Sequence, residues 1–370
     1  MADIRVTING IEFANPVLTA AGPQIRTRAQ LQAAVAGGAG GIVTKTVSVR
    51  PAADPRPTIR RTAGTGLMNC ETWAECPPKE ILTECRVVKD AGVPLVVSIG
   101  YSAADVAELG PWVEKEFSPA AIEFSTHYTG REMAPLLAVA RALRAKVRVP
   151  IWMKISPGCP EIEALAEAVQ PYVDAFVAVN SYGPVLDLDI ETGGPLLGSA
   201  GGQGWLSGPP LQPIALQIVH RLATIQEKPV IGVGGIGRGT DVIKFVMAGA
   251  TAVQVCSAAI REGNAVYSKI ATECASWLDE HGYAGLADIR GLYTRRLAES
   301  TPLDRTARMT VDESHCTGCK ACLNRCVQGA ISMPGTVAVI DPQCCIGCGF
   351  CQDFCRFDAL SLQTARHPAG

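Results

Sequence analysis

The stretch CTGCKACLNRC at residues 316–326 decides the fold of the C-terminal part of this chain. It is echoed by CIGCGFCQDFC at residues 345–355, and both runs have the spacing C-x2-C-x2-C-x3-C. In this spacing three thiolates surround one 4Fe-4S cluster, and the fourth thiolate reaches across to the other cluster. The sequence therefore predicts an electron-carrying, ferredoxin-like domain with two clusters. The predicted ligand sets are Cys316, Cys319, Cys322 and Cys355 for one cluster, and Cys345, Cys348, Cys351 and Cys326 for the other.

Two other structures would use eight thiols, namely a zinc ribbon and a disulfide module. Zinc sites usually use two separated pairs of ligands, so the duplicated spacing favours iron. The proline that usually follows the fourth cysteine is replaced by Val327 and Arg356, which alters only the local turn. The other seven cysteines are expected to be buried or spare thiols in a reducing compartment.

Composition limits the domain organisation, the localisation and the binding partners that can be expected of the chain. The chain has 370 residues, of which 48% are hydrophobic and 18% are charged, and its formal net charge is -2. These values predict one large domain and one small domain. We expect them over residues 1–306 and 307–370. No segment has transmembrane length and the N-terminus lacks a secretory signal pattern, so we expect a cytoplasmic protein. The charge balance gives no indication of binding to nucleic acid or to an anionic membrane.

Eight short apolar runs precede the cysteines, and most of the segments between them are long enough for crossover helices. Each run is continuous rather than alternating in polarity, which is typical of parallel strands covered on both faces. Eight such units in about 300 residues predict a (β/α)8 TIM barrel with its active site at the C-terminal ends of the strands. A doubly wound sheet is the alternative. The expected strands are 16–20, 41–46, 95–99, 121–125, 151–155, 175–180, 230–233 and 252–255.

A hairpin is expected before the first barrel strand. Residues 5–8 and 11–13 are joined by Asn9 and Gly10, a pair that favours a tight hairpin turn. We expect this hairpin to cap the bottom of the barrel.

The residues at the predicted strand ends indicate the chemistry. Lys45 and Lys154 suit an anionic ring or phosphate, although a single buried lysine more often forms an ion pair. Glycines after the seventh strand and small residues after the eighth match the common phosphate site of barrels. The sequence therefore predicts a phosphorylated planar cofactor. The candidate cofactor-binding residues are Ala21, Gly22, Lys45, Ser98, Lys154, Gly234, Gly235, Cys256 and Ser257.

Two further segments need interpretation. GVGGIG at residues 232–237 matches the dinucleotide fingerprint, but it occurs at the seventh repeat and lacks an acidic residue about 20 positions later. We reject that interpretation and expect electrons to arrive through the clusters or from a partner. TGLMN at residues 65–69 lies in a long connection, which predicts a functional lid that carries Asn69; a packed loop is the alternative.

The strand-end segments resemble the FMN barrel of the dihydroorotate and dihydropyrimidine dehydrogenases. With SG at 207–208, PIAL at 213–216 and the ferredoxin tail, the chain is most similar to the iron-sulfur subunit of bacterial NAD-dependent dihydropyrimidine dehydrogenase. The resembling segments are NPVLTAAG at 15–22, TKTV at 44–47, VSIG at 97–100, KISP at 154–157, VNS at 179–181 and GVGGI at 232–236.

The resemblance implies an oxidoreductase that acts on CH-CH groups. It implies FMN at the candidate cofactor residues, with Asn69, Asn180 and Ser181 facing a small substrate. FMN would exchange a hydride with a carbon-carbon bond beside a carbonyl, and electrons would pass between FMN and the clusters. The expected partners are a small-molecule substrate and an electron-donor flavoprotein or ferredoxin, and we expect a homo-oligomer.

One segment departs from the family pattern. The family has Asn-x-Ser-Cys-Pro after the fourth strand, whereas this chain has EFSTHYTG at residues 123–130. A gapless alignment places Tyr128 at the family's cysteine, and matching Phe-Ser places Thr126 there. His127 is the side chain best suited to proton transfer at neutral pH, so Thr126, His127 and Tyr128 are the catalytic candidates. The departure leaves open an electron-relay subunit and a dihydropyrimidine dehydrogenase with a replaced catalytic acid.

Overall fold

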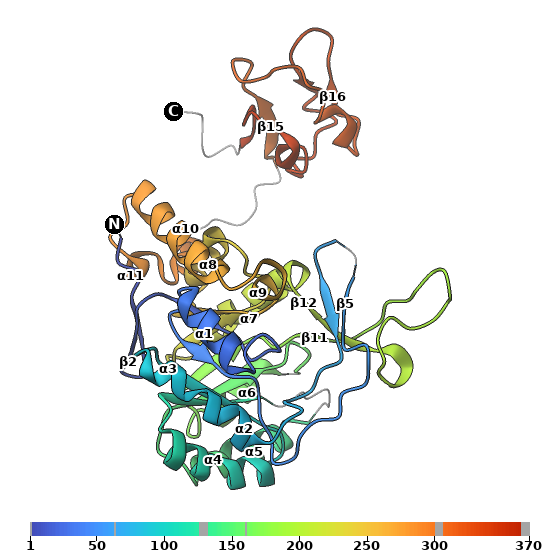
Figure 1. The fold of residues 1–370 in the computed structure, drawn as a ribbon. Coiled ribbons are helices and arrows are strands. Elements are labelled where there is room, and N and C mark those ends of the chain that lie inside the picture. The colour runs from blue at the N-terminus through green and yellow to red at the C-terminus, as the bar shows by residue number, and fades with distance from the viewer. Residues whose placement is uncertain (1, 63, 126–131, 160, 300–305, 364–370) are drawn as a thin grey trace. The chain divides into compact units, whose positions relative to one another are not determined.

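The computed structural model describes residues 2–62, 64–125, 132–159, 161–299 and 306–363 (Figure 1). The chain divides into two compact units, Met1–Ala298 and Glu299–Gly370. No helix of the described residues is long and apolar enough to cross a membrane.

The first unit is a TIM barrel, as predicted. Among the described residues, eight parallel strands pair in the order β3-β14-β13-β10-β9-β8-β7-β4. A parallel bridge between Leu18 and Gly41 links the two strands at the ends of this order. The strands are β3 (Val17–Thr19), β4 (Ile42–Val43), β7 (Leu95–Ile99), β8 (Ala121–Ser125), β9 (Ile151–Ile155), β10 (Ala175–Ala178), β13 (Val230–Val233) and β14 (Ala252–Val255).

Most helices of this unit bury an apolar face and leave a polar face exposed, whereas α12 has no fully buried residue. α4, for example, begins with a capping box in which the Ser102 hydroxyl accepts from the Asp105 backbone N-H and the Asp105 carboxylate accepts from the Ser102 backbone N-H. The helices are α1 (Arg28–Ala36), α2 (Pro78–Glu84), α3 (Arg86–Asp90), α4 (Ala103–Phe117), α5 (Ala134–Arg144), α6 (Ile162–Val169), α7 (Gln212–Ile225), α8 (Gly239–Met247), α9 (Ser257–Glu262), α10 (Val266–Glu280), α11 (Leu286–Ile289) and α12 (Leu292–Glu299).

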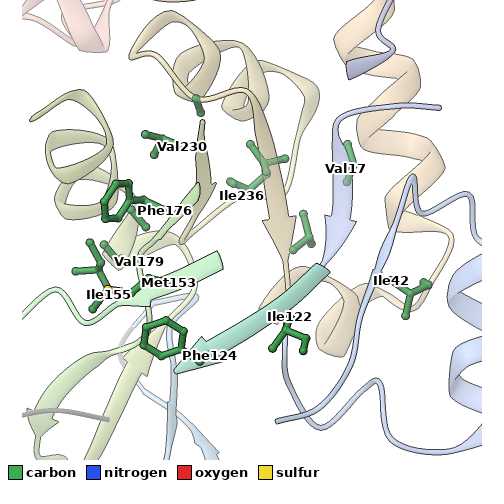
Figure 2. Packing of buried hydrophobic residues seen from close by; sticks show 14 of the residues in the cluster. Val17, Ile42, Ile122, Phe124, Met153, Ile155, Phe176, Val179, Val230 and Ile236 are labelled. Atoms are coloured by element: carbon green, nitrogen blue, oxygen red, sulfur yellow. The ribbon is translucent and has the colours of Figure 1, made fainter. Parts of the chain in front are cut away.

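Two apolar clusters hold the barrel together because successive strand residues face opposite sides of the sheet. Figure 2 shows part of the larger cluster, in which Ile122 and Phe124 of β8 pack with side chains from the neighbouring strands. The smaller cluster takes the alternate residues, including Ala121 and the fully buried Trp152. Both faces of the strands are therefore mostly apolar, which explains why their sequences are nearly continuous hydrophobic runs.

The predicted hairpin closes one end of the barrel. β1 (Val6–Ile8) and β2 (Ile11–Phe13) pair across Asn9 and Gly10, which both have positive φ, at 52° and 79°. The Trp152 indole N-H donates to Asn9 Oδ1 at 2.9 Å. Ile8 and Phe13 are buried in the same cluster as Trp152, so the hairpin covers the end of the barrel opposite the strand C-termini.

A four-stranded antiparallel sheet was not predicted. Its strands are β11 (Tyr182–Val185), β12 (Gly204–Ser207), β6 (Leu67–Asn69) and β5 (Ile59–Arg61), in that order. Asn69 pairs with Trp205 across β6 and β12. The segment expected to be a lid or a packed loop therefore contains a strand that is fixed by a partner far away in the sequence.

The second unit has a small core and two short antiparallel pairs. β15 (Arg308–Val311) pairs with β18 (Leu360–Gln363), and β16 (Ile331–Ser332) pairs with β17 (Val339–Ile340). Single 3-10 turns, η3 (Leu323–Arg325) and η4 (Gln352–Phe354), stand at the same place in the two cysteine runs. The duplication in the sequence is thus also a duplication of local structure.

Candidate functional site

A pocket lies at the C-terminal ends of the barrel strands, where β6 and β12 of the antiparallel sheet also contribute to its lining. It brings together every described residue predicted to bind cofactor or substrate except Ser98. Those residues are Ala21, Gly22, Lys45, Asn69, Lys154, Asn180, Ser181, Gly234, Gly235, Cys256 and Ser257.

Two groups of predicted residues are not placed in this pocket. Ser98 is fully buried, and its hydroxyl lies 2.9 Å from the Thr46 hydroxyl, so it contributes to strand packing rather than to the pocket lining. The catalytic candidates Thr126, His127 and Tyr128 lie outside the described residues. The strand that leads to them, β8, ends at the buried Ser125.

Lys154 is part of a buried polar network inside the barrel. Its ammonium donates to Gln254 Oε1 at 3.3 Å and lies 3.7 Å from Glu123 Oε1. Gln254 in turn donates to Glu123 Oε2 at 2.6 Å. Sequence reasoning missed Glu123 and Gln254, although a polar residue within an apolar strand is a signal, because a buried polar group needs a partner.

Lys45 has a carboxylate partner in the pocket. Its ammonium lies 3.1 Å from Glu71 Oε2, and the side chains of Lys45 and Glu71 are 7% and 15% exposed. Sequence reasoning missed Glu71, which stands two positions after Asn69. Each pocket lysine therefore forms an ion pair, and each also lines the space where a ligand would lie.

Three pocket glycines form a close backbone surface. Gly208, Gly234 and Gly235 have positive φ, at 88°, 130° and 74°. A Cβ at Gly234 would stand 2.9 Å from Ala215 Cβ, and one at Gly235 would stand 2.7 Å from Gln212 Cβ, so a side chain does not fit at either position. Backbone free of side chains lets an anion approach closely.

The donor set of this pocket fits FMN. It offers two lysine ammonium groups, the Ser257 hydroxyl and the glycine backbone, which suit a phosphate and an electron-rich ring. Cys256 lines the same space, and burial raises the pKa of its thiol to about 11 in spite of Lys154 and Lys45 nearby. The Cys256 thiol donates to Gln24 Oε1 at 3.3 Å, which suits its neutral form.

The predicted substrate residues are held by hydrogen bonds. The Asn180 amide donates to Ser125 Oγ at 3.0 Å, and its Oδ1 accepts from the Ser181 backbone N-H at 2.9 Å. The Asn69 amide donates to the Trp205 carbonyl oxygen at 3.2 Å. Both amides are thus oriented before any ligand binds, which is what precise positioning of a carbonyl requires.

The second unit gathers the eight predicted cysteines around two separate cavities. One cavity is lined by Cys316, Cys319, Cys322 and Cys355. The other is lined by Cys326, Cys345, Cys348 and Cys351. These are the crossed sets that the spacing predicts.

Backbone N-H groups point at four of these sulfurs. Ala330 donates to Cys326 Sγ at 3.2 Å and Ala359 donates to Cys355 Sγ at 3.3 Å, so each fourth cysteine has the same partner four residues later. Ala338 and Gly347 donate to Cys316 and Cys345, each at 3.4 Å. Hydrogen bonds to sulfur are one of the features by which a protein tunes an iron-sulfur cluster.

The spacing of these thiols bears on the kind of metal site. Four thiols around a cavity suit a multi-atom cluster, whereas a structural zinc ion needs four ligands at bonding distance from a single point. The cysteine arrangement fits a 4Fe-4S cluster in each cavity.

Comparisons with known proteins agree with this geometry. The dihydroorotate dehydrogenase family model matches residues 118–278, and the 4Fe-4S binding domain model matches residues 338–361. Three similar proteins are each named dihydroorotate dehydrogenase B (NAD(+)), catalytic subunit. The one from Methanocella arvoryzae is 30% identical over 79% of this chain and 99% of its own length. Those from Methanosarcina mazei and Methanopyrus kandleri are 33% and 35% identical over 78% and 76% of this chain and 95% and 92% of their own lengths.

This chain covers almost the whole length of these relatives, and the 4Fe-4S match includes the second cysteine run. The family is one of FMN oxidoreductases, and the C-terminal model indicates 4Fe-4S binding. The chain belongs to the dihydroorotate dehydrogenase family and carries a 4Fe-4S domain at its C-terminus.

Proposed function

We propose that this protein is an iron-sulfur flavoenzyme that reduces or oxidises a carbon-carbon bond next to a carbonyl in a small substrate. FMN would be held in the barrel pocket, and electrons would pass between it and two 4Fe-4S clusters. The observation that carries the proposal is that one pocket at the strand ends gathers two lysines, a glycine surface and two oriented asparagine amides.

Each group of pocket residues has a proposed role. Lys45 and Lys154 hold the ring, while Gly234, Gly235 and Ser257 hold the phosphate. The Asn69 and Asn180 amides orient the substrate carbonyl. Bound FMN would supply hydride exchange with the substrate. His127, or else Thr126 or Tyr128, would move the proton.

Two alternatives use the same pocket. A dihydropyrimidine dehydrogenase with a replaced acid is supported by the retained Asn69 and Asn180. An electron-relay subunit is supported by the altered segment at residues 126–130, which lacks the family's cysteine. For either alternative and for the main proposal, the electron partner is a flavoprotein with its own dinucleotide domain or a ferredoxin. The protein is proposed to act as a homo-oligomer in the cytoplasm.

The cofactor content tests the proposal directly. Protein purified without oxygen should release one FMN per chain and contain about eight irons per chain, which is two clusters of four. Zinc in place of iron, or about four irons, would contradict the two-cluster part. A protein that cannot be reconstituted with FMN would contradict the flavoenzyme itself.

The substrate half-reaction distinguishes an enzyme from a relay. Candidate cyclic carbonyl compounds should be screened for those that change the flavin absorbance in stopped-flow mixing without oxygen. A compound that oxidises the reduced flavin or reduces the oxidised flavin at a catalytic rate supports the enzyme. If no compound of the screen reacts with the flavin and only electron-transfer proteins do, the relay is supported.

A further inference from the structure

A carboxylate is buried inside the barrel, directly behind the lining of the pocket. Glu123 of β8 is bonded to Gln254 of β14, and three other strands separate β8 from β14 in the sheet order, so the contact crosses the barrel interior. Glu123, Lys154 and Gln254 are 0%, 5% and 1% exposed. Lys154 and Gln254 line the pocket, whereas Glu123 does not. Glu123 therefore contacts the pocket through these two side chains.

The contacts of Glu123 fix the Lys154 ammonium. Gln254 donates to Glu123 Oε2 at 2.6 Å, and its own Oε1 accepts from Lys154 at 3.3 Å. The other carboxylate oxygen, Glu123 Oε1, has no hydrogen-bond partner among the described residues and lies 3.7 Å from the Lys154 ammonium. The carboxylate thus holds the ammonium both directly, by charge, and through the Gln254 amide.

Stability alone does not account for this ion pair. Replacing a buried ion pair by apolar side chains of similar volume is often neutral or stabilising. The barrel interior accepts apolar side chains at the adjacent level, because Ala121 and Trp152, two residues before Glu123 and Lys154 on the same strands, belong to the inner apolar cluster. The position of the pair beside the pocket points instead to an effect on the group that the pocket holds.

A flavin in this pocket would respond to both charges. Reduction adds negative charge to the flavin ring, so an ammonium beside the ring stabilises the reduced form and raises the reduction potential. A carboxylate behind that ammonium offsets its charge and lowers the potential, and charges act over longer distances inside a protein than they do in water. Glu123 and Lys154 therefore have opposite effects on the same property of the flavin.

We propose that Glu123 is a positioning residue that fixes Lys154 and lowers the reduction potential of bound FMN. The inference rests on the proposed function and deepens it, because it names the residue that makes the reduced flavin a stronger electron donor. Glu123 acts through Lys154 and Gln254, and it needs no contact with the substrate.

The reduction potential of bound FMN tests this inference. The FMN-loaded full chain and its Glu123→Gln variant are titrated without oxygen against a reference dye, and the flavin is followed by its absorbance. Glutamine has the same length as glutamate and can still accept from Gln254, but it carries no charge. The potential of the variant should therefore be more positive than that of the unchanged protein.

Sulfite binding provides a second measurement that does not require reduction of the clusters. Sulfite adds to electron-poor flavins and bleaches their absorbance. Glu123→Gln should bind sulfite about tenfold more tightly than the unchanged protein does. Both measurements compare two variants of one chain, so the charges of all other residues around the flavin are common to both sides of the comparison.

Two further variants complete the experiment. Glu123→Asp keeps the charge but withdraws it by one methylene group, so its potential should lie between those of Glu123→Gln and the unchanged protein. If Glu123→Gln does not retain FMN, the Glu123→Asp variant decides the question. Glu163→Gln is the matched control, because Glu163 of α6 is paired with Arg221 of α7 and neither residue lines the pocket. This control should have the potential of the unchanged protein.

A potential and a sulfite affinity in Glu123→Gln no higher than those of the unchanged protein would overturn the inference, and so would an equal shift in Glu163→Gln. Either result would leave the flavoenzyme intact. If Glu123→Asp must decide, a potential no more positive than that of the unchanged protein overturns the inference. Failure of the unchanged protein to bind FMN would overturn the proposed function, and this inference with it.

Discussion

At the residue scale, the functional pocket depends on charges that are buried in pairs. Glu123 is the clearest case, because its carboxylate is fully buried and Lys154 is its cationic partner. Breaking a buried pair by removing one partner costs far more than removing both, since the remaining charge stays in a medium of low polarity.

Lys154→Met should therefore destabilise the barrel by about 3–5 kcal/mol at pH 7. Urea unfolding of the cofactor-free protein at that pH measures the loss of stability. The double variant Glu123→Gln/Lys154→Met should recover most of the stability but not the flavin reactivity. A double variant as unstable as the single one would show that packing, not charge, determines the loss.

The proposed function also needs a residue that transfers the substrate proton. If His127 donates or accepts the substrate proton, His127→Asn should keep FMN bound and slow the substrate half-reaction by roughly a hundredfold or more. Tyr128→Phe is the matched variant because it removes only a hydroxyl. A larger loss in Tyr128→Phe would assign the role to the tyrosine. Unchanged stopped-flow rates in both variants would remove this segment from the chemistry and favour the relay.

At the element scale, the strands that a local hydrophobic pattern determines were predicted from the sequence. The runs 95–99, 121–125, 151–155, 230–233 and 252–255 match strands β7, β8, β9, β13 and β14 at both ends. Continuous hydrophobic runs and crossover lengths are visible in the chain, so the barrel was predictable. The antiparallel sheet was not, because strands of three or four residues carry little signal and Asn69 finds its partner Trp205 136 residues later.

The functional site likewise has residues that the sequence predicts and residues that it does not. The cysteine sets and the strand-end lysines follow from spacing along the chain, and they were predicted. Glu71 and Gln254 were missed, because their roles depend on which lysine each one meets in space. Ser98 stands near a strand end, yet its hydroxyl lies 2.9 Å from the Thr46 hydroxyl and it does not line the pocket, a contact that the sequence does not reveal.

The two cysteine runs offer an internal comparison of glycines. Gly318 and Gly347 occupy the same place in each run, with φ of 68° and 69°. A Cβ would stand 2.4 Å from the Thr336 carbonyl oxygen at the first position and 2.3 Å from the Ala307 carbonyl oxygen at the second. Gly349 also has positive φ, but its Cβ would meet nothing within 4 Å.

Gly318→Ala should therefore lose the cluster of Cys316, Cys319, Cys322 and Cys355, and iron should fall from about eight to about four per chain. Gly349→Lys is the control, since the corresponding residue of the first run is Lys320, which already has φ of 62°. This control should keep the iron of the unchanged protein. Iron analysis and the visible absorbance of the clusters measure both variants. Full iron content in Gly318→Ala would refute the steric argument.

At the scale of the whole molecule, the two units carry separate parts of the proposed function. The barrel unit contains the complete described lining of the FMN pocket, from Ala20 to Ile260. The second unit contains both cysteine sets and its own small core. Flavin binding should thus not require the clusters. Entry of electrons from an external protein donor should require them.

A chain that ends at Glu299 should keep FMN and lose reduction by an external ferredoxin or flavoprotein. Light-driven reduction of the bound flavin, which needs no protein donor, should proceed as in the full chain and serves as the control for an intact barrel. The full chain should in turn oxidise NADH only slowly, because residues 232–236 belong to the end of β13 and the pocket lining rather than to a dinucleotide site. If the shortened chain accepts electrons from the protein donor as fast as the full chain does, the clusters are not the route to the flavin, and the second unit must serve another role.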